Sequence, residues 1–358
     1  MRYYIISGEA SGDLHGSNFI KAIKQIDSSA QIRAWGGDRM KAAGATLVHH
    51  YSETAFMGVW EVVKNIRRIN SLLNECKKDI LEYKPDVVVL IDYPGFNLRM
   101  AKFAKENNFK TCWYISPKLW AWKENRAHDI KKYVGLMLCI FPFEVDFYHR
   151  WNYEVKFVGH PLLDALDDSN FSTERNSIAL LPGSREQEIK SMAKVYNSVA
   201  QNFPSEKFLV AALSVHNRKI YSGFNSKNIQ LVFDDTHALL RRARAALVNS
   251  GTATLETALL DVPQMVCYKT SALTYMIAKQ LVKVKWISPV NLVLEKEAVR
   301  EFIQQDCSLN NLSNELEKIL RDENYRKEML QNYSEMKTLL GGKGASENAA
   351  KELIDFLK

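Results

Sequence analysis

The sequence predicts an α/β fold of two doubly wound, Rossmann-like domains that face each other across a cleft. Three observations support this fold class. A chain of 358 residues is long for one compact core, at roughly 150 residues per domain. Strand-like apolar runs alternate with helical patterns almost throughout, which is typical of parallel sheets. The alternation stops at the polar stretch 164–176 and then starts again, so we place a linker there.

Each series of elements can be located along the chain. The strands expected in the first series end in polar or glycine-rich turns, and they are Tyr3–Ser7, Gln31–Trp35, Asp86–Asp92, Lys110–Ser116 and Leu136–Phe141. The strands expected in the second series are Ser177–Leu181, Lys207–Leu213, Ile229–Phe233, Ala245–Asn249 and Gln264–Tyr268. We therefore predict one domain over residues 1–165 and another over 175–340. A glycine-rich turn precedes a final helix, 341–358, which can pack back on the first domain.

The composition excludes several classes of protein. Hydrophobic residues make up 46% and charged residues 25%, as in ordinary globular proteins, so a disordered, collagen-like or coiled-coil chain is not expected. No apolar run approaches the ~18 residues that a membrane span needs. The N-terminal segment MRYYIISGEASGD is too short in apolar residues for a secretory signal, so we expect a cytoplasmic protein.

The charge balance and the absence of metal-ligand motifs limit the kinds of partner that we expect. Lys and Arg total 48 against 41 acidic residues, and this surplus fits anionic small molecules or an anionic lipid surface. No recognition-helix pattern suggests nucleic acid. No Asp-x-Asp occurs, the eight histidines do not cluster, and the five cysteines are widely spaced. We therefore expect no metal and no cofactor.

A glycine-rich turn follows the first predicted strand. Glycine in a strand-to-helix turn lets a ligand approach the backbone, and the helix N-terminus favours anions. The spacing is GxxxG, not GxGxxG, which disfavours a nicotinamide cofactor. The carboxylates of this turn can accept hydrogen bonds from sugar hydroxyls, or else Ser11 or Asp13 only caps the helix. The residues predicted here as an acceptor-side loop are Gly8, Glu9, Ser11, Gly12 and Asp13.

Two further turns, in the second domain, have the same strand-to-helix layout. In the first, Gly183 permits an irregular backbone, Ser184 can cap a helix and Arg185 can pair with a phosphate. The alternative for Arg185 is a solvated surface arginine.

The second of these turns follows the strand Ala245–Asn249. The backbone amides of Ser250, Gly251 and Thr252 can face an anion, and Glu256 can accept both hydroxyls of a ribose. Alternatively, Glu256 only benefits from the helix N-terminus. Together the two turns suggest a nucleotide-diphosphate sugar, and neither is a P-loop because GxxxxGK[ST] is absent.

Asp92 ends a fully apolar strand at the edge of the predicted cleft. A partly desolvated carboxylate there can have a raised pKa and act as a general base. The alternative is an aspartate bonded to the amides of the following turn.

Seven motifs, in order, resemble those of the lipid-A-disaccharide synthase family over nearly the whole chain. They are SGEASGD at 7–13, MGVWEVV at 57–63, IDYPGFN at 91–97, ISPKLWAW at 115–122, FVGHPLLD at 157–164, LLPGSREQEI at 180–189 and NSGTATLE at 249–256. The resemblance implies an inverting, metal-independent GT-B glycosyltransferase. It would move 2,3-diacylglucosamine from UDP to the 6-hydroxyl of 2,3-diacylglucosamine 1-phosphate, releasing UDP and a β(1→6) lipid A disaccharide phosphate, a lipopolysaccharide precursor.

The resemblance also implies residue roles. Asp92 would be the base in an acceptor-side, lipid-side first domain, and Arg185, Glu256 and Asn291 would contact UDP in the second. The chain has Pro-Val-Asn at 289–291, where we expect Pro directly before Asn in the family. The resemblance therefore indicates which residue contacts UDP more firmly than it indicates the shape of this loop. The alternatives are another GT-B UDP-sugar transferase, a UDP-sugar 2-epimerase, or a non-catalytic sugar- or lipid-binding protein. The sequence leaves a homodimer open.

An amphipathic stretch at 56–73 predicts peripheral membrane contact. At helical period it places apolar residues on one stripe and bases beside it, which is typical of an interfacial helix. Together with the resemblance this predicts a location on the cytoplasmic face of the inner membrane, with Met57, Val59 and Trp60 facing lipid. The alternative is a helix that packs on the first sheet.

Overall fold

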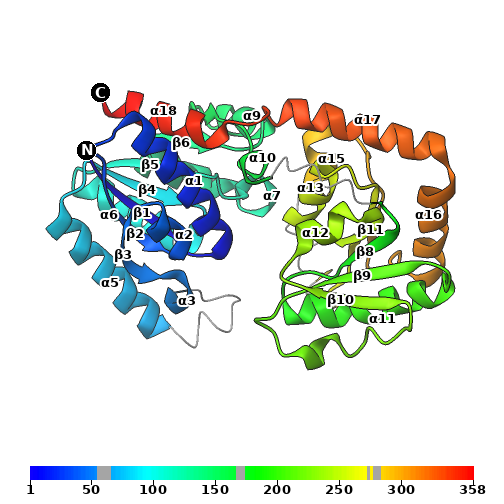
Figure 1. The fold of residues 1–358 in the computed structure, drawn as a ribbon. Coiled ribbons are helices and arrows are strands. Elements are labelled where there is room, and N and C mark those ends of the chain that lie inside the picture. The colour runs from blue at the N-terminus through cyan, green and yellow to red at the C-terminus, as the bar shows by residue number, and fades with distance from the viewer. Residues whose placement is uncertain (55–65, 167–173, 272–274, 277–283) are drawn as a thin grey trace. The chain divides into compact units, whose positions relative to one another are not determined.

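The computed structural model describes residues 1–54, 66–166, 174–271, 275–276 and 284–358 (Figure 1). The chain divides into two compact units. The first unit comprises Met1–Asp167 with Leu340–Lys358, and the second comprises Asp168–Leu339. Each unit is built on a parallel sheet flanked by helices, so the predicted class of two α/β domains is confirmed.

In its described part, the first unit has a seven-stranded parallel sheet in the order β3-β2-β1-β4-β5-β6-β7. The strand order reverses between β1 and β4, and ligands of doubly wound sheets bind outside the strand ends at such a switch point. The strands are β1 (Arg2–Ser7), β2 (Gln31–Gly36), β3 (Thr46–His50), β4 (Val87–Ile91), β5 (Lys110–Tyr114), β6 (Leu136–Cys139) and β7 (Lys156–Phe157).

The second unit repeats this topology. Its described part has a six-stranded parallel sheet in the order β10-β9-β8-β11-β12-β13, so the switch point lies between β8 and β11. The strands are β8 (Ser177–Leu181), β9 (Lys207–Ala212), β10 (Ile229–Phe233), β11 (Ala243–Asn249), β12 (Gln264–Tyr268) and β13 (Glu301–Ile303).

The helices follow the strands in both units. The described helices of the first unit are α1 (Ala10–Ile26), α2 (Asp38–Ala42), α3 (Tyr51–Thr54), α5 (Ile66–Tyr83), α6 (Pro94–Glu106), α7 (Leu119–Trp122), α8 (Ala127–Tyr133), α9 (Phe143–His149), α10 (Leu162–Ala165) and α18 (Ala345–Leu357). Those of the second unit are α11 (Glu186–Asn202), α12 (Thr236–Arg241), α13 (Thr252–Leu259), α15 (Pro289–Leu294), α16 (Leu309–Arg321) and α17 (Glu323–Leu339). Two short 3-10 turns are η1 (Glu124–Arg126) and η2 (Arg218–Tyr221).

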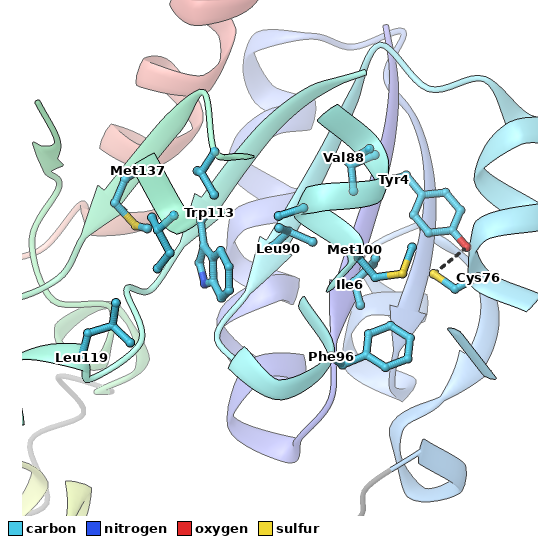
Figure 2. Close-up of a cluster of buried hydrophobic side chains, with 14 of the residues drawn as sticks. Tyr4, Ile6, Cys76, Val88, Leu90, Phe96, Met100, Trp113, Leu119 and Met137 are labelled. Atoms are coloured by element: carbon cyan, nitrogen blue, oxygen red, sulfur yellow. Dashed lines mark hydrogen bonds between the residues drawn. The ribbon is translucent and has the colours of Figure 1, made fainter. Parts of the chain in front are cut away.

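The core of the first unit explains why its central strands are so regular. All five side chains of β4 are buried, as expected for a strand covered on both faces. Figure 2 shows Val88 and Leu90 among the aromatic and sulfur-containing side chains of neighbouring elements. The one polar atom that enters this cluster from β1, the Tyr4 hydroxyl, donates to Asp79 at 2.6 Å and accepts from the indole of Trp35 at 2.8 Å. Satisfied in this way, it costs little to bury.

The C-terminal helix belongs to the first unit. Helix α18 packs on α1 and also contacts α10, β5 and β6 (Figure 1). Asp164 fixes its start, because its carboxylate accepts hydrogen bonds from the amides of Gly344 (2.7 Å), Ala345 (3.2 Å) and Ser346 (2.8 Å). Among the described residues, none of the helices is long and apolar enough to cross a membrane.

Candidate active site

The switch point of the first unit brings Glu9 and Asp92 to the same edge of the sheet, because Glu9 follows β1 and Asp92 follows the paired strand β4. Asp92 (φ 43°) and Tyr93 (φ 50°) both adopt the left-handed conformation, and α6 begins directly afterwards. The fully buried Asn97 secures this bend, since its Nδ2 donates to the carbonyls of Asp92 (2.7 Å) and Ile91 (3.2 Å). Such strained turns persist only where the surroundings hold them, and they are often functional.

The environment of Asp92 gives its carboxyl group the acidity of a general base. Burial, first, and the nearby carboxylate of Glu9, second, raise the pKa of Asp92 to about 6. The charge of Lys118 and the backbone amide of Tyr93 oppose this rise. A base with a pKa near the working pH is deprotonated at neutrality yet basic enough to take a proton.

The glycine-rich turn after β1 is shaped by close packing. A Cβ on Gly8 would lie 2.5 Å from the ring of Tyr93, and one on Gly12 would lie 2.8 Å from the hydroxyl of Ser7. Side chains at these two positions would therefore push α1 away from the sheet. Helix α1 begins at Ala10, and Ser11 in its first turn is exposed.

Asp13 does not cap its own helix, contrary to one of the two interpretations of this turn. It is buried, and its carboxylate accepts hydrogen bonds from the amides of Gly37 (2.8 Å), Met40 (3.0 Å) and Arg39 (3.2 Å). Asp13 therefore caps the following helix, α2. With its oxygens engaged in this way, Asp13 supports the turn, and Glu9 is the carboxylate of the turn that lies close to Asp92.

In the second unit, the turn after β8 is closed by its own helix. Helix α11 begins after Arg185, and one carboxylate oxygen of Glu188 accepts hydrogen bonds from the amides of Ser184 (3.1 Å) and Arg185 (3.2 Å). The other oxygen accepts from the Arg185 guanidinium at 3.0 Å. Gly183 has φ 109°, which favours glycine. The amides of Ser184 and Arg185, and the guanidinium predicted to pair with a phosphate, are thus bound to a carboxylate of the chain itself.

The turn after β11 is open. Helix α13 begins at Thr252 with no side-chain cap, so the amides of Thr252 and Ala253 have no intrahelical partner. The amide of Thr254 donates to the carbonyl of Gly251 at 3.2 Å. The amide of Ser250, which was predicted to face an anion, instead donates to the carbonyl of Cys267 at 3.0 Å. Gly251 has φ 158°, and a Cβ there would have no atom within 4 Å. The buried Oδ1 of Asn249, just before the turn, has no hydrogen-bond partner among the described residues. That oxygen is an acceptor and suits a ligand hydroxyl, whereas the amides left without an intrahelical partner at the start of α13 suit an anion.

Glu256 lies on α13, one turn beyond this open site. It is half-buried, and its carboxylate makes no hydrogen bond or salt bridge with a residue that the structure describes. Burial raises the pKa of Glu256, and the neighbouring His237 partly offsets that rise. The carboxylate is available for a ligand with paired hydroxyls.

Asn291 is fully engaged inside the second unit. Its Nδ2 donates to the carbonyl of Val299 (2.8 Å) and to Glu301 (2.9 Å), and its Oδ1 accepts from the amides of Ala298 (2.9 Å) and Val299 (3.0 Å). These four bonds use the whole capacity of an amide side chain. The predicted contact of Asn291 with UDP stays a prediction, and the geometry favours a positioning role.

Other predictions fall elsewhere. Met57, Val59 and Trp60, predicted to face lipid, lie outside the described residues. Within the described ranges, no three His, Cys, Asp or Glu side chains are grouped to hold a metal. The sequence analysis did not single out Asn249 or Glu188. Asn249 shows the same signal as Asp92, a polar residue that ends an apolar strand, and Glu188 completes a capping box with Arg185.

The two parallel α/β units, each with a switch point in its sheet, define the protein as one of GT-B architecture. The UDP-GlcNAc 2-epimerase from Neisseria meningitidis, solved with UDP-GlcNAc, is similar with a TM-score of 0.66 and 12% identity, over 100% of this chain and 99% of that one. The glycotransferase of kitacinnamycin is similar with a TM-score of 0.67 and 13% identity, over the same shares of the two chains. At this identity the likeness shows the fold alone.

Sequence comparison specifies the family. Residues 3–354 match the model of the lipid-A-disaccharide synthetase family. The lipid-A-disaccharide synthase of Trichlorobacter lovleyi is 36% identical over 100% of this chain and 98% of its own length. That of Coxiella burnetii (strain CbuG_Q212) is 35% identical over 99% and 98%. The chain therefore belongs to the lipid-A-disaccharide synthase family of glycosyltransferases, which act in lipid A biosynthesis.

Proposed function

We propose that the protein joins UDP-2,3-diacylglucosamine to 2,3-diacylglucosamine 1-phosphate with inversion, giving a β(1→6) disaccharide 1-phosphate and UDP. The observation that carries this proposal is the carboxylate of Asp92, held in a strained turn at a switch point with a pKa of about 6. A hydroxyl acceptor needs such a base, and membership of the family supports these two lipids as the substrates we propose.

The reaction is a single in-line displacement. Asp92 takes the proton of the acceptor 6-hydroxyl while that oxygen forms a bond to C1 of the donor sugar. The bond between C1 and the diphosphate oxygen breaks, and its electron pair leaves with UDP. Attack from the face opposite the leaving group inverts C1.

The open turn of the second unit would hold the leaving group. The unpaired amides at the start of α13 stabilise the charge that develops on the diphosphate, and Glu256 accepts the ribose hydroxyls. Arg185 can add a positive charge by offering the diphosphate the N–H groups that its bond to Glu188 leaves free. Asn291 holds the segment around α15 and β13 in place.

Both proposed substrates carry apolar acyl chains, which favours an enzyme that takes them up at a membrane surface. We propose peripheral contact with the cytoplasmic face of the inner membrane through the N-terminal part of the segment 56–73. The other end of this segment packs inside the first unit, where Leu72 and Leu73 are buried in its hydrophobic core. Flotation with anionic vesicles tests this, comparing the wild type with the triple variant Met57→Ser/Val59→Ser/Trp60→Ser. A folded triple variant that floats as well as the wild type would move the contact elsewhere.

The direct test of the proposed function is a transfer assay. Purified protein is incubated with both lipids in detergent micelles, and UDP and lipid products are separated by chromatography. We expect equal amounts of UDP and disaccharide phosphate, and a turnover about 10²–10⁴-fold lower for Asp92→Asn with UDP binding retained. UDP released without the disaccharide, or a donor sugar altered without an acceptor, would instead indicate hydrolysis or an epimerase.

A further inference from the structure

Three basic side chains between Lys118 and Arg126 lack acidic partners. Lys118 immediately precedes α7, Lys123 immediately follows it, and Arg126 ends η1. None of the three makes a hydrogen bond or salt bridge with its side chain to any residue in the described ranges. Elsewhere in this unit, exposed lysines do find partners, as Lys102 does with Glu106 one helical turn away.

Two of these bases lie close together, and neither forms a salt bridge with an acidic side chain among the described residues. Lys123 and Arg126 are both half-buried, and the amide of Arg126 donates to the carbonyl of Lys123 at 3.0 Å. Burial, first, and the charge of Arg126, second, lower the pKa of Lys123. Like charges that share a partly dry surface repel each other, and a bound dianion would convert that repulsion into attraction.

An exposed aromatic ring completes this surface. Trp122 is 49% exposed, and the Nζ of Lys123 lies 4.0 Å from the centre of its ring. Helix α7, which carries Trp122, is anchored to the interior of the unit, because the indole of Trp120 donates to the buried carboxylate of Glu144 at 3.1 Å. Glu144 in turn accepts from the amides of Ile140 and Phe141, both at 3.1 Å. The bases are therefore carried on an anchored turn.

This basic turn lies near the candidate base. The charge of Lys118 acts on Asp92, where it opposes the rise of the pKa. It acts in the same direction on Glu144, the anchor of the turn. Lys118 therefore lies close enough to Asp92 and to Glu144 for its charge to act on both carboxyl groups.

We propose that Lys123 and Arg126, with Lys118 and Trp122 beside them, bind the phosphate of the phosphorylated acceptor sugar. This inference rests on the proposed function, which gives the acceptor one hydroxyl to activate and one phosphate to hold. A phosphate held on this turn would orient the acceptor sugar, and Trp122, which is 49% exposed, offers a flat apolar face to the ring or to an acyl chain. The site selects acceptors that carry a phosphate.

The test measures how well the enzyme distinguishes phosphorylated from dephosphorylated acceptor. Steady-state rates are measured in neutral detergent micelles for the wild type and for Lys123→Ala/Arg126→Ala. We expect KM for the phosphorylated acceptor to rise about 10–100-fold, as for the loss of charge-assisted hydrogen bonds. The preference in kcat/KM over the dephosphorylated acceptor should fall by a similar factor, while UDP affinity stays unchanged.

Three variants serve as controls. Lys41→Ala removes an exposed lysine of α2 in the same unit and should leave both acceptors unaffected. Lys123→Arg/Arg126→Lys keeps both charges and should restore most of the preference for the phosphorylated acceptor. If the double alanine variant does not fold, Lys118→Ala changes an exposed side chain and should still raise KM for the phosphorylated acceptor several-fold.

The possible outcomes distinguish a phosphate site from a membrane contact and from a turn with no role in acceptor binding. An unchanged KM, or an equal loss on both acceptors, overturns it. So does weaker flotation of the double variant on phosphatidylglycerol vesicles with normal micelle kinetics, which would make the turn a membrane contact. If the wild type forms no disaccharide, the proposed function fails, and calorimetry with glucosamine 1-phosphate against glucosamine still tests the phosphate site. Equal binding of the two sugars would then refute it.

Discussion

The two strand-to-helix turns of the second unit both carry a glycine before a helix. The helix that follows one turn is capped by a side chain, and the helix that follows the other is not. Both follow central strands at the switch point, and both contain a glycine of positive φ before a helix. In the turn after β8, Glu188 occupies the amides and the guanidinium that would otherwise meet a phosphate. In the turn after β11, α13 has no side-chain cap and Gly251 faces open space.

The difference shows that a glycine-rich turn is not by itself an anion site. A helix leaves its first four amides without partners, and the chain can satisfy them itself or leave them for a ligand. Counting where those amides go distinguishes the two cases. By that count the turn after β11 is the better diphosphate site, and the turn after β8 contributes chiefly by presenting Arg185.

The largest expected effect on UDP binding is at Glu256. Glu256→Ala removes the carboxylate proposed to accept the ribose hydroxyls, and a lost charged hydrogen bond corresponds to about a 10–100-fold weaker UDP affinity. Isothermal titration with UDP measures it. Glu186→Ala is the matched control, since Glu186 is an exposed acid in the first turn of α11 that pairs only with Lys190 among the described residues. Equal losses in the two variants would refute the assignment.

Alanine substitutions at Gly183 and Gly251 should affect different properties, stability in the first case and UDP affinity in the second. A Cβ on Gly183 would lie 2.4 Å from a carboxylate oxygen of Glu188 and 2.8 Å from Nδ2 of Asn249. Gly183→Ala should therefore lower the free energy of unfolding by about 1–3 kcal/mol, as measured by urea denaturation. Gly251→Ala puts its methyl group where the anion would sit, so UDP affinity should suffer more than in Gly183→Ala. Weaker stability from Gly251→Ala with normal UDP binding would reverse the comparison.

The cap of α11 should matter for stability and little for UDP. Glu188→Ala leaves the amides of Ser184 and Arg185 without their carboxylate, which should cost about 0.5–2 kcal/mol, the usual range for a lost cap. Thermal unfolding measures the loss, and calorimetry should find a UDP affinity within about threefold of the wild type. A clear gain in UDP affinity would mean that Glu188 competes with the diphosphate after all.

The smallest expected effect is on the pH dependence of UDP binding. Burial raises the pKa of Glu256 above its ordinary value, so acidification protonates this carboxylate earlier than an exposed one. A neutral carboxyl accepts ribose hydroxyls less well, so UDP affinity should fall as the pH drops from 7.5 towards 5. Glu256→Gln should flatten that part of the profile. The same slope in both proteins would assign the pH effect to another group.

Much of the fold could be predicted from the sequence because the central strands are unbroken apolar runs. Val87–Ile91 and Ser177–Leu181 are buried on both faces, and both were predicted. The edge strands β3, β7 and β13 were missed. They are short and only partly buried, so their sequences lack the apolar run that signals a strand.

The candidate site was predictable where its signal is local. Asp92 ends an apolar strand, and the glycines and Glu256 of the turn after β11 share one segment. The sequence could not reveal that Asp13 caps the helix that begins about 24 residues further along the chain. Nor could it reveal that the side chain of Asn291 makes all its hydrogen bonds with the segment around β13. Those partners meet only through tertiary packing, and no local pattern encodes them.

Amide hydrogen exchange with and without UDP tests the central claim most directly, because it reports on both turns in one experiment. We expect saturating UDP to slow exchange at the amides of residues 251–253 and to leave exchange at those of 184 and 185 unchanged. Protection at 184 and 185 without protection at 251–253 would contradict it and place the diphosphate on the turn after β8.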